Sequence, residues 1–378
     1  MSNCVQNPDA ADIRIRTEYE NDFESRYIIE VYEGGDVPVS HGAFRFINTR
    51  FGNGYIKTMM TGGVATPPEY RRNGYVKKIF DKAYEMAIEK GAVVALLHPF
   101  SFSYYYKFGY GKVADHKVVR CPIRLIDFVP RFNNLTAYDE TEAKLEDLIS
   151  VYNRFSSGRN LMPIRYNDRY FKNKKIYIYY QNGNPEGYIA YKEDKKLYSH
   201  HYEDGVMTVS EIAYTNPDAL DAILGFIRMY EGELDDVVFE NISMCPEIER
   251  KLSHYTHTRY ELIPDLSARI LNTEELFRAH TYPEQKGTFK VRVNDKLSTV
   301  AGSFEVTYEF GTCNVNRLSD DADVDFVIES AELARLIYGY DGITSSEAIY
   351  SPGISITGNT EDFFRAFTKK TAGIFELF

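Results

Sequence analysis

The stretch from residue 62 to residue 76, GGVATPPEYRRNGYV, constrains the fold more than any other part of the chain. It ends a predicted strand, passes through a turn that contains Gly74, and opens a predicted helix. Apolar residues then recur at helical spacing, at Val76, Ile79, Phe80, Ala83 and Ala87. Gly91 is typical of a left-handed helix stop, and the apolar run at 92–97 predicts a strand covered on both faces.

The turn before this helix has the chemistry of a phosphate site. The first N–H groups of a helix have no partner within the helix, and the positive end of the helix dipole favours an anion. Gly74 lets the backbone approach a ligand closely, and Arg71 and Arg72 can donate to phosphate oxygens. The spacing is neither that of a nucleotide triphosphatase nor that of a dinucleotide dehydrogenase. Taken alone, the turn is equally compatible with a solvated loop.

A second stretch, SYYYKFGYG at residues 103–111, runs from a short helical piece into a glycine corner. Together the two stretches resemble motifs A and B of the GCN5-related N-acetyltransferases (GNAT), Val-x-x-x-Pro-x-x-Arg-x-x-Gly and Tyr-x-x-x-Gly-Phe/Tyr. The form Tyr-x-x-Phe-Gly-Tyr-Gly, from Tyr105 to Gly111, is similar to the branch typified by the mycobacterial enhanced intracellular survival (Eis) acetyltransferases. The resemblance is closest over residues 54–120 and implies acetyl-CoA as co-substrate.

The resemblance assigns roles to individual residues. Tyr105, four residues before Gly109, becomes the general acid that protonates the leaving thiolate, with a phenol pKa near 10 suited to that task. Its alternative is a packing role beside Tyr104 and Tyr106. The implied cofactor-binding residues are Val64, Ala65, Thr66, Arg71, Arg72, Asn73, Gly74, Tyr75, Val76, Lys77, Phe100 and Ser101. Within this set, the strand 64–66 would polarise the thioester carbonyl and pair with the pantetheine arm.

Neither motif places a histidine or glutamate where a general base is needed. In the Eis branch the base is the carboxylate of the last residue, which implies Phe378 here. The apolar tail TAGIFELF at 371–378 is predicted to be buried, in keeping with that role. The alternatives are a tail that only docks on the third domain, or a base supplied by Glu376 or by a water chain.

The predicted fold class is α+β with mixed sheets, as tandem GNAT-like domains followed by a sterol-carrier-like domain. Residues 1–125 form the catalytic domain, with strand candidates at 27–32, 42–47 and 55–60. The two helices that the family places between its first strands have almost no room between residues 17 and 25.

Residues 126–262 repeat the order of meander, central strand, helix and strand. Their turn, Thr215 to Asp218, has no glycine and no cation, which predicts a second GNAT-like domain without a cofactor site. Residues 263–378 alternate cleanly in three strands and resemble the family's sterol-carrier-like domain, for which the resemblance implies a structural role.

The composition and net charge limit the classes of molecule that the protein is expected to bind. The net charge of −11 disfavours nucleic acid and is compatible with a cationic substrate. The sequence contains no apolar run of about 18 residues, so no membrane span is expected. No secretory signal is visible either, so a cytoplasmic protein is expected. The cysteines are scattered, and the histidine pairs 200–201 and 254/257 lack partners at ligand spacing, so no metal is expected.

The predicted function is therefore acetyl-CoA-dependent N-acetylation of primary amines on aminoglycoside-, polyamine- or lysine-like acceptors, by direct attack. The alternative is a non-catalytic acyl-CoA- or lipid-binding module. The resemblance also implies a homo-oligomer, a ring that is often a hexamer.

Overall fold

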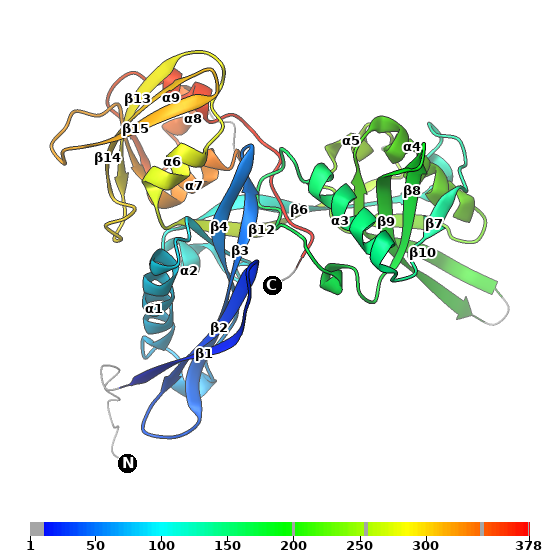
Figure 1. Cartoon of the computed structure of the whole chain (residues 1–378), viewed down its shortest axis with the longest axis horizontal. Helices are drawn as coiled ribbons and strands as arrows, with labels where there is room; N and C mark the ends of the chain where they lie inside the picture. Colours follow the sequence, from blue (N-terminus) through cyan, green and yellow to red (C-terminus); the bar gives the residue numbers. More distant parts are fainter. Residues whose placement is uncertain (1–10, 199–200, 253–255, 341–343, 377) are drawn as a thin grey trace. The chain divides into compact units, whose positions relative to one another are not determined.

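The computed structural model describes residues 11–198, 201–252, 256–340, 344–376 and 378. These residues fold into two units, each of which is interrupted in sequence (Figure 1). The first unit contains the residues up to Val113, the segment Leu266–Lys370, and Phe378. The second contains the segment Ala114–Asp265 and the tail that begins at Thr371.

The first sheet of the first unit has the strand order β1-β2-β3-β4-β5-β12. Its strands are β1 (Asp12–Glu20), β2 (Glu24–Tyr32), β3 (Pro38–Phe51), β4 (Gly54–Ala65), β5 (Val94–Leu97) and β12 (Arg259–Ile270). Neighbours are antiparallel except β4 and β5, which run parallel. The end of β12 pairs with β5, from Ser267 opposite Leu97 to Ile270 opposite Val94. All four side chains of β5 are buried, as the apolar run predicted.

Helix α1 (Tyr75–Glu89) follows β4 through the 3-10 turn η2 (Pro68–Tyr70) and packs on β2 and β3. Its buried side chains are Tyr75, Ile79, Phe80, Ala83, Tyr84, Met86 and Ala87. The predicted apolar stripe is therefore confirmed, except that Val76 is only half-buried. Gly91 has φ +73°, which confirms the left-handed stop. The short helix α2 (Phe102–Tyr106) follows β5 at the position of the predicted helical piece.

Strand β1 was not among the predicted strands. Its sequence, DIRIRTEYE, alternates Ile13, Ile15 and Tyr19 with charged residues, so the strand signal was present and was missed, although nearly all of its side chains are exposed at the edge of the sheet. A short turn joins it directly to β2, with Asn21 Oδ1 accepting from the N–H groups of Phe23 and Glu24. Between residues 11 and 24 the structure has no helix, in agreement with the expected lack of room.

The second sheet of the first unit has the order β15-β14-β13-β16-β17. Its strands are β13 (Gly287–Asn294), β14 (Gly302–Glu309), β15 (Thr312–Leu318), β16 (Phe326–Glu329) and β17 (Ile354–Ile356). The accompanying helices are α6 (Thr273–Ala279), α7 (Ser330–Ile337), α8 (Ser345–Ala348) and α9 (Glu361–Ala366). The alternation predicted for β13 is confirmed, since Phe289, Val291 and Val293 are all buried.

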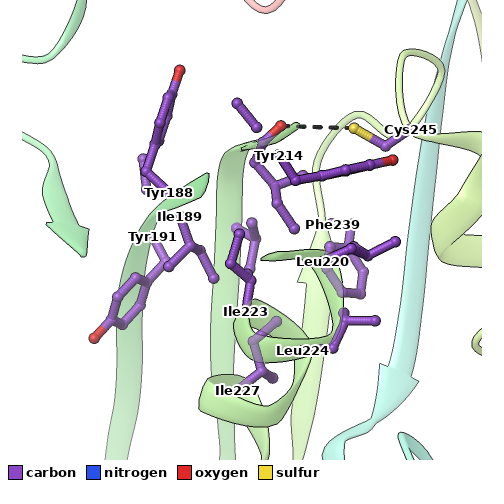
Figure 2. Close-up of a cluster of buried hydrophobic side chains, with 14 of the residues drawn as sticks. Tyr188, Ile189, Tyr191, Tyr214, Leu220, Ile223, Leu224, Ile227, Phe239 and Cys245 are labelled. Carbon is purple, nitrogen blue, oxygen red and sulfur yellow. Dashed lines mark hydrogen bonds between the residues drawn. The ribbon is translucent and has the colours of Figure 1, made fainter. Parts of the chain in front are cut away.

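The sheet of the second unit has the order β6-β11-β10-β9-β8-β7. Its strands are β6 (Tyr110–Pro122), β7 (Leu135–Ala137), β8 (Lys175–Gln181), β9 (Asn184–Tyr198), β10 (His201–Tyr214) and β11 (Asp236–Phe239). Helices and 3-10 turns complete it: η3 (Ile123–Leu125), α3 (Glu142–Phe155), η4 (Asp168–Tyr170), α4 (Pro217–Ile227), η5 (Arg228–Tyr230) and α5 (Pro246–Glu249). Figure 2 shows α4 presenting Leu220, Ile223 and Ile227 within its apolar core. The predicted repeat of meander, central strand, helix and strand is confirmed.

None of the helices in the described ranges is long and apolar enough to cross a bilayer.

Candidate active site

The start of α1 leaves its first amides available. The N-cap residue Gly74 has φ +80°, a conformation that favours glycine, and no side chain caps the helix. A Cβ built on Gly74 would meet no atom within 4 Å, so the backbone there borders open space. The preceding Arg72 also adopts a left-handed conformation, with φ +68°. The predicted phosphate corner therefore has accessible backbone donors at the end of a helix.

A cavity of about 670 Å³ opens at this corner, within the range of about 300–1,000 Å³ that is usual for ligand pockets. Its lining comprises Val64, Ala65, Thr66, Tyr70, Arg71, Arg72, Gly74, Tyr75, Val76, Lys77, Phe100, Tyr104, Tyr105 and Phe108. The structure thus brings together every predicted cofactor residue except Asn73 and Ser101, which are not in the lining. Ser101 instead caps α2 by accepting from Tyr104 N–H. Tyr70, Tyr104 and Phe108 line the cavity but were not among the predicted site residues.

The two strands beside the cavity separate where it begins. Pairing between β4 and β5 extends from Thr58 opposite Val94 to Thr61 opposite Leu97, whereas β4 continues to Ala65. Beyond Thr61, β3 is the one strand among the described residues that pairs with β4. Arg71 Nε donates to the Thr66 carbonyl at 3.1 Å and so ties the turn to the end of the strand. The last residues of β4 therefore present one free main-chain edge in the cavity wall.

Tyr105 lies at the other wall of the cavity, in an aromatic cluster. Its ring is 5.4 Å from that of Phe100, 5.2 Å from Tyr104 and 5.9 Å from Tyr110 between centroids. Burial, reinforced by the neighbouring tyrosines, raises the pKa of Tyr105 to about 12, above the value near 10 expected from the sequence. Tyr105 thus keeps its proton at neutral pH and also packs with its neighbours.

Phe378 belongs to the same unit and is not in the lining of this cavity, but it lies against Gly62, two residues before the cavity residue Val64. Its main-chain carbonyl carbon and oxygen are 2.7 and 2.6 Å from the position of a Cβ built on Gly62 of β4. Its ring is 4.8 Å from that of His98, the residue after β5. The sequence analysis named neither Gly62 nor His98 as a site residue. The only available signal for His98 was its position at the end of the apolar run 92–97.

Glu376, the alternative base, is engaged in an ion pair within the second unit. Its carboxylate lies 2.7 Å from the guanidinium of Arg165, whose side chain is fully buried. Arg165 also pairs with the buried carboxylate of Glu211, and Tyr188 donates to the same carboxylate. The pairing holds the pKa of Glu211 at about 2, because the cations outweigh the effect of burial. Glu376 thus has a structural partner.

The corresponding corner of the second unit differs from the first. Asn216 caps α4 by accepting from Ala219 N–H at 2.9 Å, so a protein side chain already uses that donor. The sequence predicted no cation within the turn from Thr215 to Asp218, and that turn contains none. Basic side chains from other segments line a cavity of about 740 Å³ beside it: Arg154, Arg159, Arg250 and Lys251. Only the tertiary fold brings these cations to the turn.

The scattered cysteines and histidines predicted no metal site. In the described part of the chain, no three His, Cys, Asp or Glu side chains gather closely enough to hold a metal ion. Cys4, His200 and His254 lie outside the described residues.

Two family models of acetyltransferase (GNAT) domains match the chain, one over residues 2–113 and one over residues 161–270. No curated protein matches it in sequence.

Several solved structures share its fold at 15% identity. They include a GCN5-related N-acetyltransferase from Anabaena variabilis ATCC 29413, with a TM-score of 0.79 over 93% of this chain and 89% of that chain. Eis1 from Mycobacterium abscessus has a TM-score of 0.78 over 98% and 100%. A probable N-acyltransferase of unknown function from Enterococcus faecalis V583 has a TM-score of 0.77 over 97% and 100%.

Proposed function

The chain is an acetyltransferase with two GNAT domains in tandem, and from this premise we propose that it acetylates primary amines of cationic acceptors. GNAT domains use acetyl-CoA as co-substrate, and the acceptors we propose are aminoglycosides, polyamines or lysine side chains. The net charge of −11 supports a cationic acceptor through long-range attraction. The observation that carries the proposal is the cavity that connects the uncapped start of α1 with Tyr105.

The residues around this cavity fit the co-substrate. The amides at the start of α1, with Arg71 and Arg72, match a diphosphate. The free edge of β4 at Val64 and Ala65 matches the amides of a pantetheine arm, by the pairing that a further strand would make. We assign cofactor binding in the first domain to this set, together with Asn73 and Ser101 beside it.

The reaction needs two proton transfers. The acceptor nitrogen attacks the thioester carbonyl carbon, a C–N bond forms, and the C–S bond breaks with its electron pair on sulfur. We assign the carboxylate of Phe378 to remove the proton from the acceptor nitrogen, directly or through water. Tyr105 donates its phenol proton to the leaving thiolate. With a pKa of about 12, Tyr105 is a weak acid towards a thiol near 8.5, so the donation must accompany C–S cleavage.

The test measures CoA thiol release from acetyl-CoA with a panel of amines. Tyr105→Phe is expected to lower kcat by about 10²- to 10⁴-fold, the usual contribution of a general acid. Tyr55→Phe, at an exposed tyrosine near the start of β4 and outside the cofactor cavity, is the matched control. Deletion of Phe378 is expected to cost a similar factor. Binding of acetyl-CoA without turnover on any amine would contradict the proposal and favour an acyl-CoA-binding module.

We also propose that residues 263–378 form a sterol-carrier-like domain with a structural role. Aromatic rings fill the space beside its sheet, with Phe326 and Phe363 stacked at 4.1 Å and Phe289 5.2 Å from Phe363. A lipid would have to displace these rings. By the same resemblance we propose a cytoplasmic homo-oligomeric ring, which light scattering after gel filtration would detect.

A further inference from the structure

A second cleft lies against the cofactor cavity in the first unit. It has a volume of about 740 Å³ and shares the wall residues Lys77, Tyr104 and Phe108 with the first cavity. Its other side is formed by the loop after β13, including Lys296. The two hollows therefore flank one wall, and the second is bounded in part by residues far along the chain from either GNAT motif.

The lining of this cleft carries four cations and three carboxylates, and so a net charge of +1. Lys107, at the end of α2, and Lys296 are exposed, and neither is paired with a carboxylate in the described ranges. Of the acidic residues in the lining, Asp295 is bound to the nearly buried guanidinium of Arg269 at 2.9 Å. Glu329 accepts from the neutral Asn294 side chain at 3.1 Å and keeps its negative charge.

The remaining acid, Asp81, is paired with Lys77 at 2.5 Å. The cleft also has aromatic walls, since the rings of Tyr104 and Phe108 lie 5.6 Å apart. Two unpaired ammonium groups beside aromatic rings suit a ligand that combines a phosphate with an aromatic base.

We propose that this cleft takes the 3′-phosphoadenosine end of acetyl-CoA, an inference that rests on the proposed function. The co-substrate joins its thioester arm and its adenosine through the diphosphate assigned to the start of α1. Lys77 lies in the first turn of that helix and borders both hollows, so the chain of the co-substrate can pass from one to the other there. Lys107 and Lys296 bind the 3′-phosphate, and the Tyr104–Phe108 wall contacts the adenine.

This assignment gives the third domain a part in co-substrate recognition. Lys296 belongs to the segment after β13, whereas the diphosphate and thioester sites belong to the N-terminal GNAT domain. The third domain would therefore distinguish CoA from its analogue without the 3′-phosphate.

Calorimetric titration of the full chain with CoA and with 3′-dephospho-CoA tests the proposal. The wild type is expected to bind CoA at least about tenfold more tightly, because each charge-assisted contact is worth about that factor. Lys296→Ala should weaken CoA binding and leave dephospho-CoA binding unchanged, so the ratio falls towards one. Lys82→Ala is the matched control, because this exposed lysine of α1 pairs with Glu85 and lines neither hollow.

The outcomes separate the two levels of inference. Equal affinity of the wild type for the two nucleotides, or equal weakening of both by Lys296→Ala, would overturn the adenosine assignment alone. Failure of the wild type to bind either nucleotide would overturn the proposed function as well. Raised salt should shrink the CoA preference, because the exposed charges are screened.

Discussion

Gly62→Ala should displace the carboxyl group of Phe378 without disturbing β4, the strand that contains Gly62. Gly62 does not have a left-handed backbone, so alanine is tolerated conformationally. The added Cβ would lie 2.6 Å from the Phe378 carbonyl oxygen and 2.7 Å from its carbon. Non-bonded heavy atoms settle at roughly 3.5 Å, so the carboxyl group has to retreat by about 1 Å.

The size of the effect follows from that displacement. Misplacement of a reacting group by about 1 Å costs roughly 100-fold in rate. A loss of 100-fold corresponds to about 2.7 kcal/mol of transition-state stabilisation. We therefore expect kcat to fall by about 100-fold in Gly62→Ala. The KM for acetyl-CoA should change little, since the residues at the α1 start are untouched.

Steady-state thiol-release kinetics with a productive amine provides the assay. Gly54→Ala is the matched control, because Gly54 begins the same strand and a Cβ there would meet nothing within 4 Å. In a chain that lacks Phe378, Gly62→Ala should cause no further loss, since the group it displaces is already gone. A wild-type rate in Gly62→Ala, or an undiminished 100-fold loss in the chain without Phe378, would refute the reasoning.

Two further predictions concern stability. Glu376→Gln removes one of the two carboxylates that pair with the buried guanidinium of Arg165. The free energy of unfolding, measured by urea titration, should fall by about 1–3 kcal/mol and no more, because Glu211 still neutralises the guanidinium. An unchanged urea midpoint would contradict this. Burial lowers the pKa of Lys370 from 10.5 to about 8, so its charged form destabilises the folded state below pH 8 and this penalty disappears as the pH rises to 10.5. Lys370→Met should be more stable than wild type at pH 7 by up to about 3 kcal/mol and lose that advantage near pH 10.5, as urea titrations at the two pH values would show. An equal difference at both pH values would contradict this.

The sequence predicted the local elements around the site because each carries a local pattern. The stripe of α1, the apolar run of β5 and the glycine corner after α2 are all encoded within a few neighbouring residues. The edge strand β1 was missed although its apolar residues alternate with charged ones, because only three of its nine residues are apolar and most of its side chains are exposed.

Contacts between distant segments could not be predicted from such patterns. Nothing near Gly62 or His98 indicates that Phe378 will lie against them. The charges beside Asn216 in the second unit likewise come from other elements. The same holds for Lys296, whose place beside the first domain follows only from the tertiary structure.

The pairing of β12 with β5 sets a limit on how the chain can be divided. A fragment ending near residue 125 would keep both GNAT motifs of the first domain but lose the strand that covers one edge of β5. That edge belongs to Val94–Leu97, whose side chains are all buried in the intact chain. Open, apolar strand edges recruit other strands, so such a fragment should form intermolecular sheets and precipitate. The first domain is complete only after the polypeptide has been synthesised well past residue 260.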